Sequence, residues 1–421
     1  MNHSENIDHD AVLRARTLLL GSGGITVHQE ADAYRILARV SPAAYLPRLA
    51  RTLLTFSYRQ LVMPELRLPV LTEAVAAARR IDGAEPNRAK LLTDTLDACR
   101  HELYTLGRRA EAFALCEEMA HEGRRAFEAG HVASPVYAHD PLATALAEEG
   151  RHEEAARLFG EIARVARAEG DPSAVPFWHT VAWVAELDAA GRHGEAVDAF
   201  ATLVEAGRER LDRDGTSLAM LVWKLVRLAG MLDADGRRDE ARTARKEVLG
   251  LLTELADSGE RKGWSNILSW WRVLLALSGR TDEQPVPGEP APAFGVNLGW
   301  SPDVRKAYLD GREPLMEAIE ALSPPVGSVP VRDRLAEMVL LQRKLTHRSV
   351  MYWESRTHLI LDPLRPLFDE GVALARRLAA VDDDRGPAVL ARALTDRSTL
   401  LVAGKRYGEA LADFREAVDL G

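Results

Sequence analysis

The chain has 421 residues, of which 47% are hydrophobic and 28% are charged, and this is the composition of a soluble protein with a packed core. Its formal net charge of -9 makes the phosphate backbone of nucleic acid a poor default partner. No apolar run approaches the roughly 18 residues of a membrane span, and the polar N-terminus MNHSENIDHD lacks the features of a signal peptide. We therefore expect a cytoplasmic protein with neither nucleic-acid nor membrane partners. Arginine far outnumbers lysine among the 54 basic residues, which indicates a high-GC, actinobacterial source.

The first forty residues predict a pair of helices, over residues 10–20 and 27–40. Thr26 and Gln29 have the spacing of a capping box at the start of the second helix. The glycine-rich stretch GSGG, at residues 21–24, joins the two helices. A phosphate-binding loop is the alternative, but no strand precedes GSGG and its spacing does not match such loops, so we interpret it as an interhelical turn.

Five later segments share a pattern of an apolar helix, a glycine with a basic neighbour, and a second helix. Their glycines are spaced by 43, 41, 45 and 43 residues and are Gly107, Gly150, Gly191, Gly236 and Gly279. Glycine adopts without steric penalty the left-handed conformation that ends many helices. The even spacing therefore predicts a stack of helix hairpins.

The second helices of three units carry an alanine followed by an aromatic residue four positions later. These pairs are Ala155 with Phe159, Ala196 with Phe200, and Ala410 with Phe414. In this respect the chain resembles the tetratricopeptide repeat (TPR) family, in its longer variety of about 42 residues found in kinesin light chains and in many actinobacterial proteins. The resemblance implies an all-α fold, a right-handed superhelix (solenoid) of antiparallel helix pairs. The sequence departs from the family pattern at Cys116 and Arg245, which stand where the aromatic residue belongs, and it largely lacks the Trp and Leu-Gly signature of the first helix.

The predicted organisation has four parts. They are an N-terminal helix pair at 1–40, a TPR-like array at 41–282, a Pro-rich linker or strap at 283–301, and C-terminal helical, TPR-like repeats at 302–421, with a helix expected at 301–322. The last unit, GKRYGEALADFREAVDLG, lacks a capping helix. Its apolar edge, with Leu411 and Val418, predicts packing onto a second copy as a homodimer, docking of another partner, or a boundary within a longer chain.

The sequence offers no recognisable reaction centre, so we expect no catalytic residue, no metal site and no cofactor. Cys99 and Cys116 lack zinc-site spacing and are expected to be buried free thiols. The stretches LDRDG and LDADG fail the spacing of calcium loops and are interpreted as turns. His152 and His193 follow turn glycines by two residues and are expected to pack or cap. The stretch LTHRSVMYWESRTHLI is interpreted as a packed helix face containing His347, Arg348, Tyr352, Trp353 and Arg356.

Tryptophans recur at equivalent places in the repeats. Trp178 and Trp223 lie thirteen residues before a turn glycine, and Trp183 and Trp271 lie eight residues before one. If the geometry of the TPR family applies, the first pair faces the concave groove and the second pair faces the interior. The same count places further residues on the groove: Asp94, Asp97, His101, Tyr104, Tyr137, Asp140, Asp188, Asp233 and Asn266. Such an acidic, aromatic groove suits a basic or aromatic peptide; the alternative is that the tryptophans fill the core and the carboxylates are merely solvated.

The leading functional hypothesis is a scaffold or regulatory adaptor that binds a protein or peptide in its concave groove, because solenoids present long concave surfaces. An enzyme or small-molecule binder of a natural-product pathway, built on the same helical scaffold, is the second hypothesis. A peptide-sensing transcription regulator is the third hypothesis, but the N-terminal helix pair is not basic enough to favour it.

Overall fold

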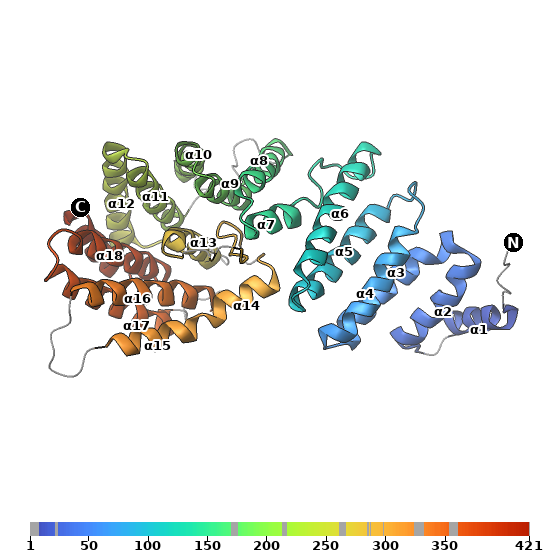
Figure 1. Cartoon of the computed structure of the whole chain (residues 1–421). Coiled ribbons are helices and arrows are strands. Elements are labelled where there is room, and N and C mark those ends of the chain that lie inside the picture. Colours follow the sequence, from blue (N-terminus) through green and yellow to red (C-terminus); the bar gives the residue numbers. More distant parts are fainter. Residues whose placement is uncertain are drawn as a thin grey trace. The chain divides into compact units, whose positions relative to one another are not determined.

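All regular secondary structure is helical in the residues that the computed structural model describes. These are 8–21, 24–169, 176–212, 217–260, 267–283, 286, 288–297, 299–323, 332–352 and 361–420. The chain divides into two compact units, which Figure 1 shows in chain order by colour. Unit 1 comprises Met1–Ala145 with Ser301–Asp303, and unit 2 comprises Leu146–Trp300 with Val304–Gly421. This division falls inside a helix of the predicted 41–282 array. No helix in the described ranges combines the length and the apolarity needed to cross a bilayer.

Unit 1 is a run of antiparallel helices in which each of the first six helices packs on its neighbour in the chain. The helices are α1 (His9–Leu20), α2 (Val27–Val40), α3 (Pro42–Gln60), α4 (Pro64–Arg79), α5 (Arg88–Thr105), α6 (Arg109–Glu128) and the start of α7 (Asp140–Glu148). The two predicted N-terminal helices are confirmed, as is the capping box between Thr26 and Gln29. Part of the GSGG stretch, Ser22 and Gly23, lies outside the described residues.

Unit 2 begins as a similar run and ends with a second group of helices. Its helices are α8 (His152–Glu169), α9 (Phe177–Ala189), α10 (His193–Asp212), α11 (Leu218–Ala234), α12 (Arg238–Ser258), α13 (Ile267–Gly279), the 3₁₀ helix η1 (Arg280–Asp282), α14 (Pro302–Asp310), α15 (Arg312–Leu322), α16 (Arg332–Tyr352), α17 (Leu361–Ala379), α18 (Gly386–Ala403) and α19 (Tyr407–Asp419). The single helix predicted over 301–322 is therefore two helices. They meet at Gly311, where any side chain would collide with the guanidinium of Arg348.

The predicted glycine turns end helices by a shared hydrogen-bonding pattern. Four of the five glycines have φ between 70° and 79°, and the amide after each donates to the carbonyl five residues earlier at 2.8–2.9 Å. In the last unit Lys405 adopts this conformation, with φ 61°. Gly279 differs, because its φ is -89° and it lies where a side chain would collide with the ring of His347. The sequence pattern thus identified a helix end at Gly279, but the glycine is needed there for close packing.

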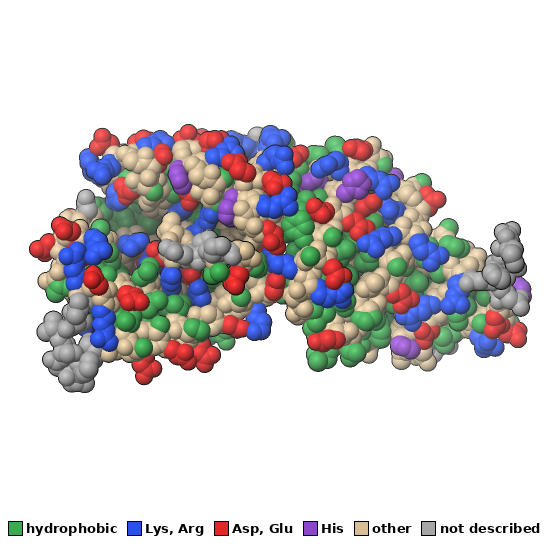
Figure 2. Space-filling view, in the orientation of Figure 1, with side chains coloured by type: hydrophobic (Ala, Val, Ile, Leu, Met, Phe, Trp, Pro, Cys, Tyr) green, Lys and Arg blue, Asp and Glu red, His purple; other side chains and the backbone are tan. Residues whose placement is uncertain are grey.

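A ladder of ion pairs accompanies the repeats and was not predicted. At five of the left-handed turns, the next residue is an arginine that bonds a glutamate three residues later: Arg108–Glu111, Arg151–Glu154, Arg192–Glu195, Arg237–Glu240 and Arg406–Glu409. Other pairs join second helices across 38–40 residues: Arg35–Glu73, Arg79–Glu118, Arg208–Glu247 and Arg376–Glu416. Each such exposed pair contributes only about 0–1 kcal/mol. Figure 2 accordingly shows acidic and basic side chains interspersed over the visible face.

Alanine and phenylalanine pack between successive helices, as the repeat pattern predicts. The exposed fractions are 3% or less at all six positions: Ala155, Phe159, Ala196, Phe200, Ala410 and Phe414. Alanine lets the paired helices approach, and the aromatic ring fills the space between hairpins. Full burial of each phenylalanine stabilises the fold by about 1.5–3 kcal/mol.

The C-terminal hairpin folds back onto the array, so the prediction of an uncovered last unit is wrong. Helix α19 packs on α12, while α18 contacts α11 and α13 (Figure 1). Two indole groups hold α18 in place, because Trp223 donates to the carbonyl of Thr399 at 3.2 Å and Trp271 donates to its hydroxyl at 3.0 Å. Leu411 and Val418, on the predicted exposed edge, are half-buried.

The Pro-rich segment is an ordered strap wherever it is described. The amide of Ala291 donates to the carbonyl of Glu148 at 2.9 Å, and Phe294 is buried. A side chain at Gly295 would collide with α9, at 2.7 Å from the backbone of Val181. The strap therefore lies directly against the end of α7 and against α9.

We predict that Gly191→Ala lowers the free energy of unfolding of unit 2 by about 1–2 kcal/mol, because L-residues other than glycine disfavour the left-handed conformation. Gly194→Ala is the matched control, since Gly194 lies in the first turn of α10 with open space around its Cα. It should be neutral or stabilising, because alanine is the better helix former. Urea unfolding followed by tryptophan fluorescence measures both, because all eight tryptophans belong to unit 2. Equal effects of the two substitutions would contradict the turn assignment.

Candidate functional site

Two of the three carboxylates predicted to line a groove in unit 1, Asp94 and Asp97, have ion-pair partners within that unit. Asp94 lies 2.8 Å from Lys90, and Asp97 lies 2.6 Å from Arg100. Both aspartates remain partly exposed. Their charges are thus largely offset by neighbouring cations, which weakens the basis for an acidic groove.

The aromatic members of the predicted set in unit 1 belong to the interior more than to a surface. Tyr104 is 1% exposed, and its hydroxyl faces the sulfur of Cys116 at 3.8 Å. Tyr137 lies in the loop before α7, where its hydroxyl is 3.2 Å from that of Thr93. The exposed members of the set in this unit are His101 and Asp140.

In unit 2 the predicted groove residues are likewise engaged within the chain. Trp223 is 2% exposed and bonds Thr399, so it is a core residue. Trp178 is half-buried, with its ring 5.4 Å from that of Trp270. Asn266 lies outside the described residues. The alternative that the tryptophans fill the core therefore holds for Trp223, and the predicted interior position of Trp271 is confirmed by its exposure of 1%.

The remaining predicted carboxylates of unit 2 also have intrachain partners. Asp188 accepts from His193 at 2.8 Å, and Asp233 pairs with Arg245. Arg245 is the residue that replaces the expected aromatic of its repeat, so an ion pair takes the place of ring packing there. Within unit 2, the described members of the predicted set therefore make contacts inside the chain.

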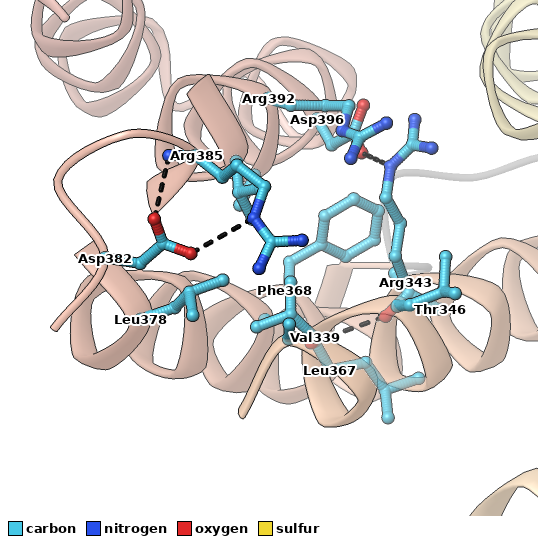
Figure 3. A pocket seen from close by; sticks show the side chains of 15 residues that line it. Val339, Arg343, Thr346, Leu367, Phe368, Leu378, Asp382, Arg385, Arg392 and Asp396 are labelled. Carbon is cyan, nitrogen blue, oxygen red and sulfur yellow. Dashed lines mark hydrogen bonds and ion pairs between the residues drawn. The ribbon is translucent and has the colours of Figure 1, made fainter. Parts of the chain in front are cut away.

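A different hollow, the α16–α18 trench, is the best-formed candidate site in the described residues. Its cavity has a volume of about 140 Å³ and lies between α16 and α18, with α17 as its floor. The floor and walls are apolar, with Val339, Leu367, Phe368, Leu378 and Val389. Figure 3 shows three arginines around this surface: Arg343 on α16, Arg385 at the N-cap of α18, and Arg392 on α18.

Arg343 forms the buried end of the trench and is fully paired. Its Nε lies 2.7 Å from the carboxylate of Asp396, and a terminal nitrogen contacts Asp282. Its side chain is only 10% exposed. Although burial opposes ionisation of Asp396, attraction to Arg343 holds the pKa of that carboxyl below its ordinary value. This end is a fixed salt-bridge cluster that positions α16 against α18.

Arg385 and Arg392 form the open side of the trench. Their side chains are 59% and 46% exposed. The Nε of Arg385 lies 3.2 Å from Asp382 (Figure 3). The ion pair of Arg392 with Asp282 spans 3.6 Å, which is beyond ordinary hydrogen-bonding distance. Guanidinium N–H groups at this rim can therefore receive an anionic group from a ligand.

Sequence reasoning missed the trench, although a local signal existed. Four residues of α16 at helical spacing, Ala336, Val339, Leu340 and Arg343, form one wall. This spacing places the four residues on one face of a helix, but the opposite wall, on α18, begins about fifty residues later in the sequence. The neighbouring stretch from His347 was expected to be a packed face, and His347 is indeed 4% exposed while Tyr352 is 51% exposed beneath Arg312. Trp353 and Arg356 lie outside the described residues.

The cysteines and histidines that the sequence offers as possible reactive groups have structural roles. Cys99 and Cys116 are buried free thiols, as expected, and burial raises the pKa of Cys99. His152 bonds Glu186 at 2.7 Å. Among the described residues, no group of three or more His, Cys, Asp or Glu side chains has the arrangement of a metal site. The trench thus remains the leading candidate.

Comparison with known proteins adds no relative. No family model matches the chain, and no curated protein sequence matches it.

We predict that His347 makes unit 2 less stable as the pH falls from 7 to 5. Burial, reinforced by the charge of Arg343, holds the pKa of His347 below its ordinary value of about 6.5. Below pH 6.5 the unfolded state therefore binds more protons than the folded state, and stability is lost as the pH falls. His347→Gln should make this decline shallower by up to about 1.4 kcal/mol per pH unit. Tryptophan-monitored unfolding at several pH values measures the slope.

The control for this prediction is His193→Gln, which removes an imidazole that is 57% exposed. It should change the slope less than His347→Gln does. An unchanged slope in the His347 variant would show that its protonation is not coupled to folding.

Proposed function

We propose that the protein is a TPR-type adaptor that binds an acidic, apolar segment of a partner protein in the α16–α18 trench. The observation that carries this proposal is an apolar hollow of about 140 Å³ with two exposed guanidinium groups at its rim. An acidic side chain can reach the rim while an adjacent apolar side chain fills the floor. The proposal keeps the adaptor hypothesis but changes the site and the charge expected of the partner.

The TPR-type assignment rests on three repeated features. The alanine and aromatic positions of the second helices are buried, the hairpins turn through a left-handed residue, and ion pairs link second helices at 38–40 residues. Stacked hairpins with these features present their first helices on one face. Helices α16 and α18 are successive first helices, so the trench lies on the face that such scaffolds use for binding.

The size of the trench favours a protein segment over a free small molecule. Sites for drug-sized ligands occupy about 300–1,000 Å³. The trench, at about 140 Å³, accommodates one or two side chains. Side-chain anchors of this kind carry much of the energy at protein interfaces, while the surrounding backbone contacts the rim.

The charge of the partner follows from the rim. The side chains that line the trench include three arginines and two aspartates. The buried ion pair of Arg343 with Asp396 neutralises one arginine and one aspartate. At the open rim, Arg385 pairs with Asp382 at 3.2 Å and lies 3.9 Å from Asp333, whereas Arg392 has a long ion pair. An incoming carboxylate would therefore complete the pairing of Arg392, which lies 3.6 Å from Asp282.

We predict that a fluorescently labelled twelve-residue peptide alternating Glu or Asp with Leu or Phe binds the full chain. The matched probe replaces every acidic residue with Lys and should bind at least tenfold more weakly. Combining Arg385→Ala with Arg392→Ala should weaken binding of the acidic peptide by about tenfold or more, since two charge-assisted hydrogen bonds are lost. Added salt should also weaken binding. Fluorescence anisotropy measures all four effects.

Arg415→Ala is the control variant, because Arg415 is an exposed arginine on α19 that does not line the trench. It should leave the affinity unchanged. The proposal fails if the lysine peptide binds equally well, or if Arg415→Ala weakens binding as much as the double variant does.

A further inference from the structure

We propose that Lys224 is a carbonyl-reactive site, whose amine condenses with an aldehyde that carries an aromatic or other apolar group. The site is separate from the trench and does not depend on the proposed adaptor function. It lies on α11, where the amine is enclosed by aromatic side chains.

Lys224 is buried, and no carboxylate of the described residues pairs with it. Its side chain is 7% exposed, and its amine donates to the carbonyl of Leu203 at 3.3 Å. Among the described residues it forms no ion pair, and the charged group that most affects it is Arg210, which has the same sign. A lysine held in this way differs from the protein's paired lysines, such as Lys90 with Asp94.

The surroundings of the amine form an aromatic wall. Phe177 and Trp270 stack with their ring centroids 3.7 Å apart, and the amine lies 5.9 Å and 5.6 Å from these two centroids. Trp178 extends the wall, 5.4 Å from Trp270. Phe177 is buried, whereas both tryptophans are partly exposed. The wall therefore leads from the amine toward solvent and offers stacking surface to an aromatic ligand.

Helix α10 packs closely beside the amine. A Cβ placed at Gly207 of α10 would lie 3.5 Å from the Lys224 nitrogen and 3.2 Å from the side chain of Leu221. The glycine thus lets α10 approach α11 next to the amine.

Packing alone does not account for a lysine here. Burying an ammonium without an opposite charge costs free energy, and methionine would fill the same volume without that cost. The same burial, together with the charge of Arg210, lowers the pKa of Lys224 to about 8. About a quarter of the amine is then neutral at pH 7.5, on the order of a hundred times more than for an ordinary lysine. Neutral amine is the form that attacks a carbonyl group.

The reaction balances without an oxidant or a reductant. The nitrogen lone pair of Lys224 attacks the carbonyl carbon, and the carbonyl π electrons move to oxygen to give a carbinolamine after proton transfer. Loss of water then forms the C=N bond of an imine. One amine and one aldehyde thus give one imine and one water, and the aromatic wall holds the apolar part of the aldehyde.

The test uses the full chain with benzaldehyde as the probe at pH 7.5, and sodium cyanoborohydride to reduce the imine to a stable benzylamine. Peptide mass mapping then gives the modification rate of each lysine. Lys224 should be modified at least tenfold faster than Lys246, an exposed lysine on α12. Glyoxylate, an aldehyde without an apolar group, should show a smaller preference for Lys224.

Lys224→Met is the matched variant, and its thermal midpoint should be equal to or above that of the parent chain. It should abolish the fast benzaldehyde reaction and leave modification of Lys246 unchanged. If Lys224 in the folded parent chain reacts no faster than Lys246, the proposal is overturned. Fast modification that occurs only in denaturant would overturn it as well.

Discussion

Unit 2 depends on the contact between α18 and the two helices α11 and α13. Thr399 accepts hydrogen bonds from the indoles of Trp223 and Trp271, and all three residues are buried. An indole N–H without a partner in this interior would cost about 1–3 kcal/mol. The contact therefore fixes where the C-terminal helices lie, and α19 covers α12 as a consequence.

The docking of the C-terminal helices on α11, α12 and α13 also determines which charged groups pair around the trench. Arg343 on α16 reaches both Asp282, just after α13, and Asp396 on α18. Arg348 pairs with Glu283 at 2.7 Å. Asp282 and Glu283 follow α13, so their ion pairs with α16 form only when the C-terminal helices are docked. The pair of Arg343 with Asp396 joins α16 to α18 directly. Arg385 and Arg392 remain at the rim, more exposed than Arg343.

The sequence was sufficient for features that depend on local conformation. The left-handed turn at Gly191, the capping box at Thr26 and the buried pair Ala196 and Phe200 follow from residue types at short spacings. Each of these features either recurs along the chain or matches a defined short motif, so it can be recognised in the sequence. The division into two units within α7 has no such local signal.

Features made by distant residues were not predictable in this way. Trp223 occupies the place that suggested a groove, but its partner Thr399 lies 176 residues later. Gly279 matches the turn pattern, yet the reason for the glycine is the ring of His347. The trench likewise needs α16 and α18 side by side. In each case the decisive contact is set by the return of the C-terminal helices, which short-range spacing does not encode.

The most direct test of this closure is a double-mutant cycle between Trp271→Phe and Thr399→Val, measured by urea unfolding of unit 2. The account predicts a coupling free energy of about 1 kcal/mol, because residues that share a buried hydrogen bond do not contribute independently. Strictly additive effects of the two substitutions would contradict it.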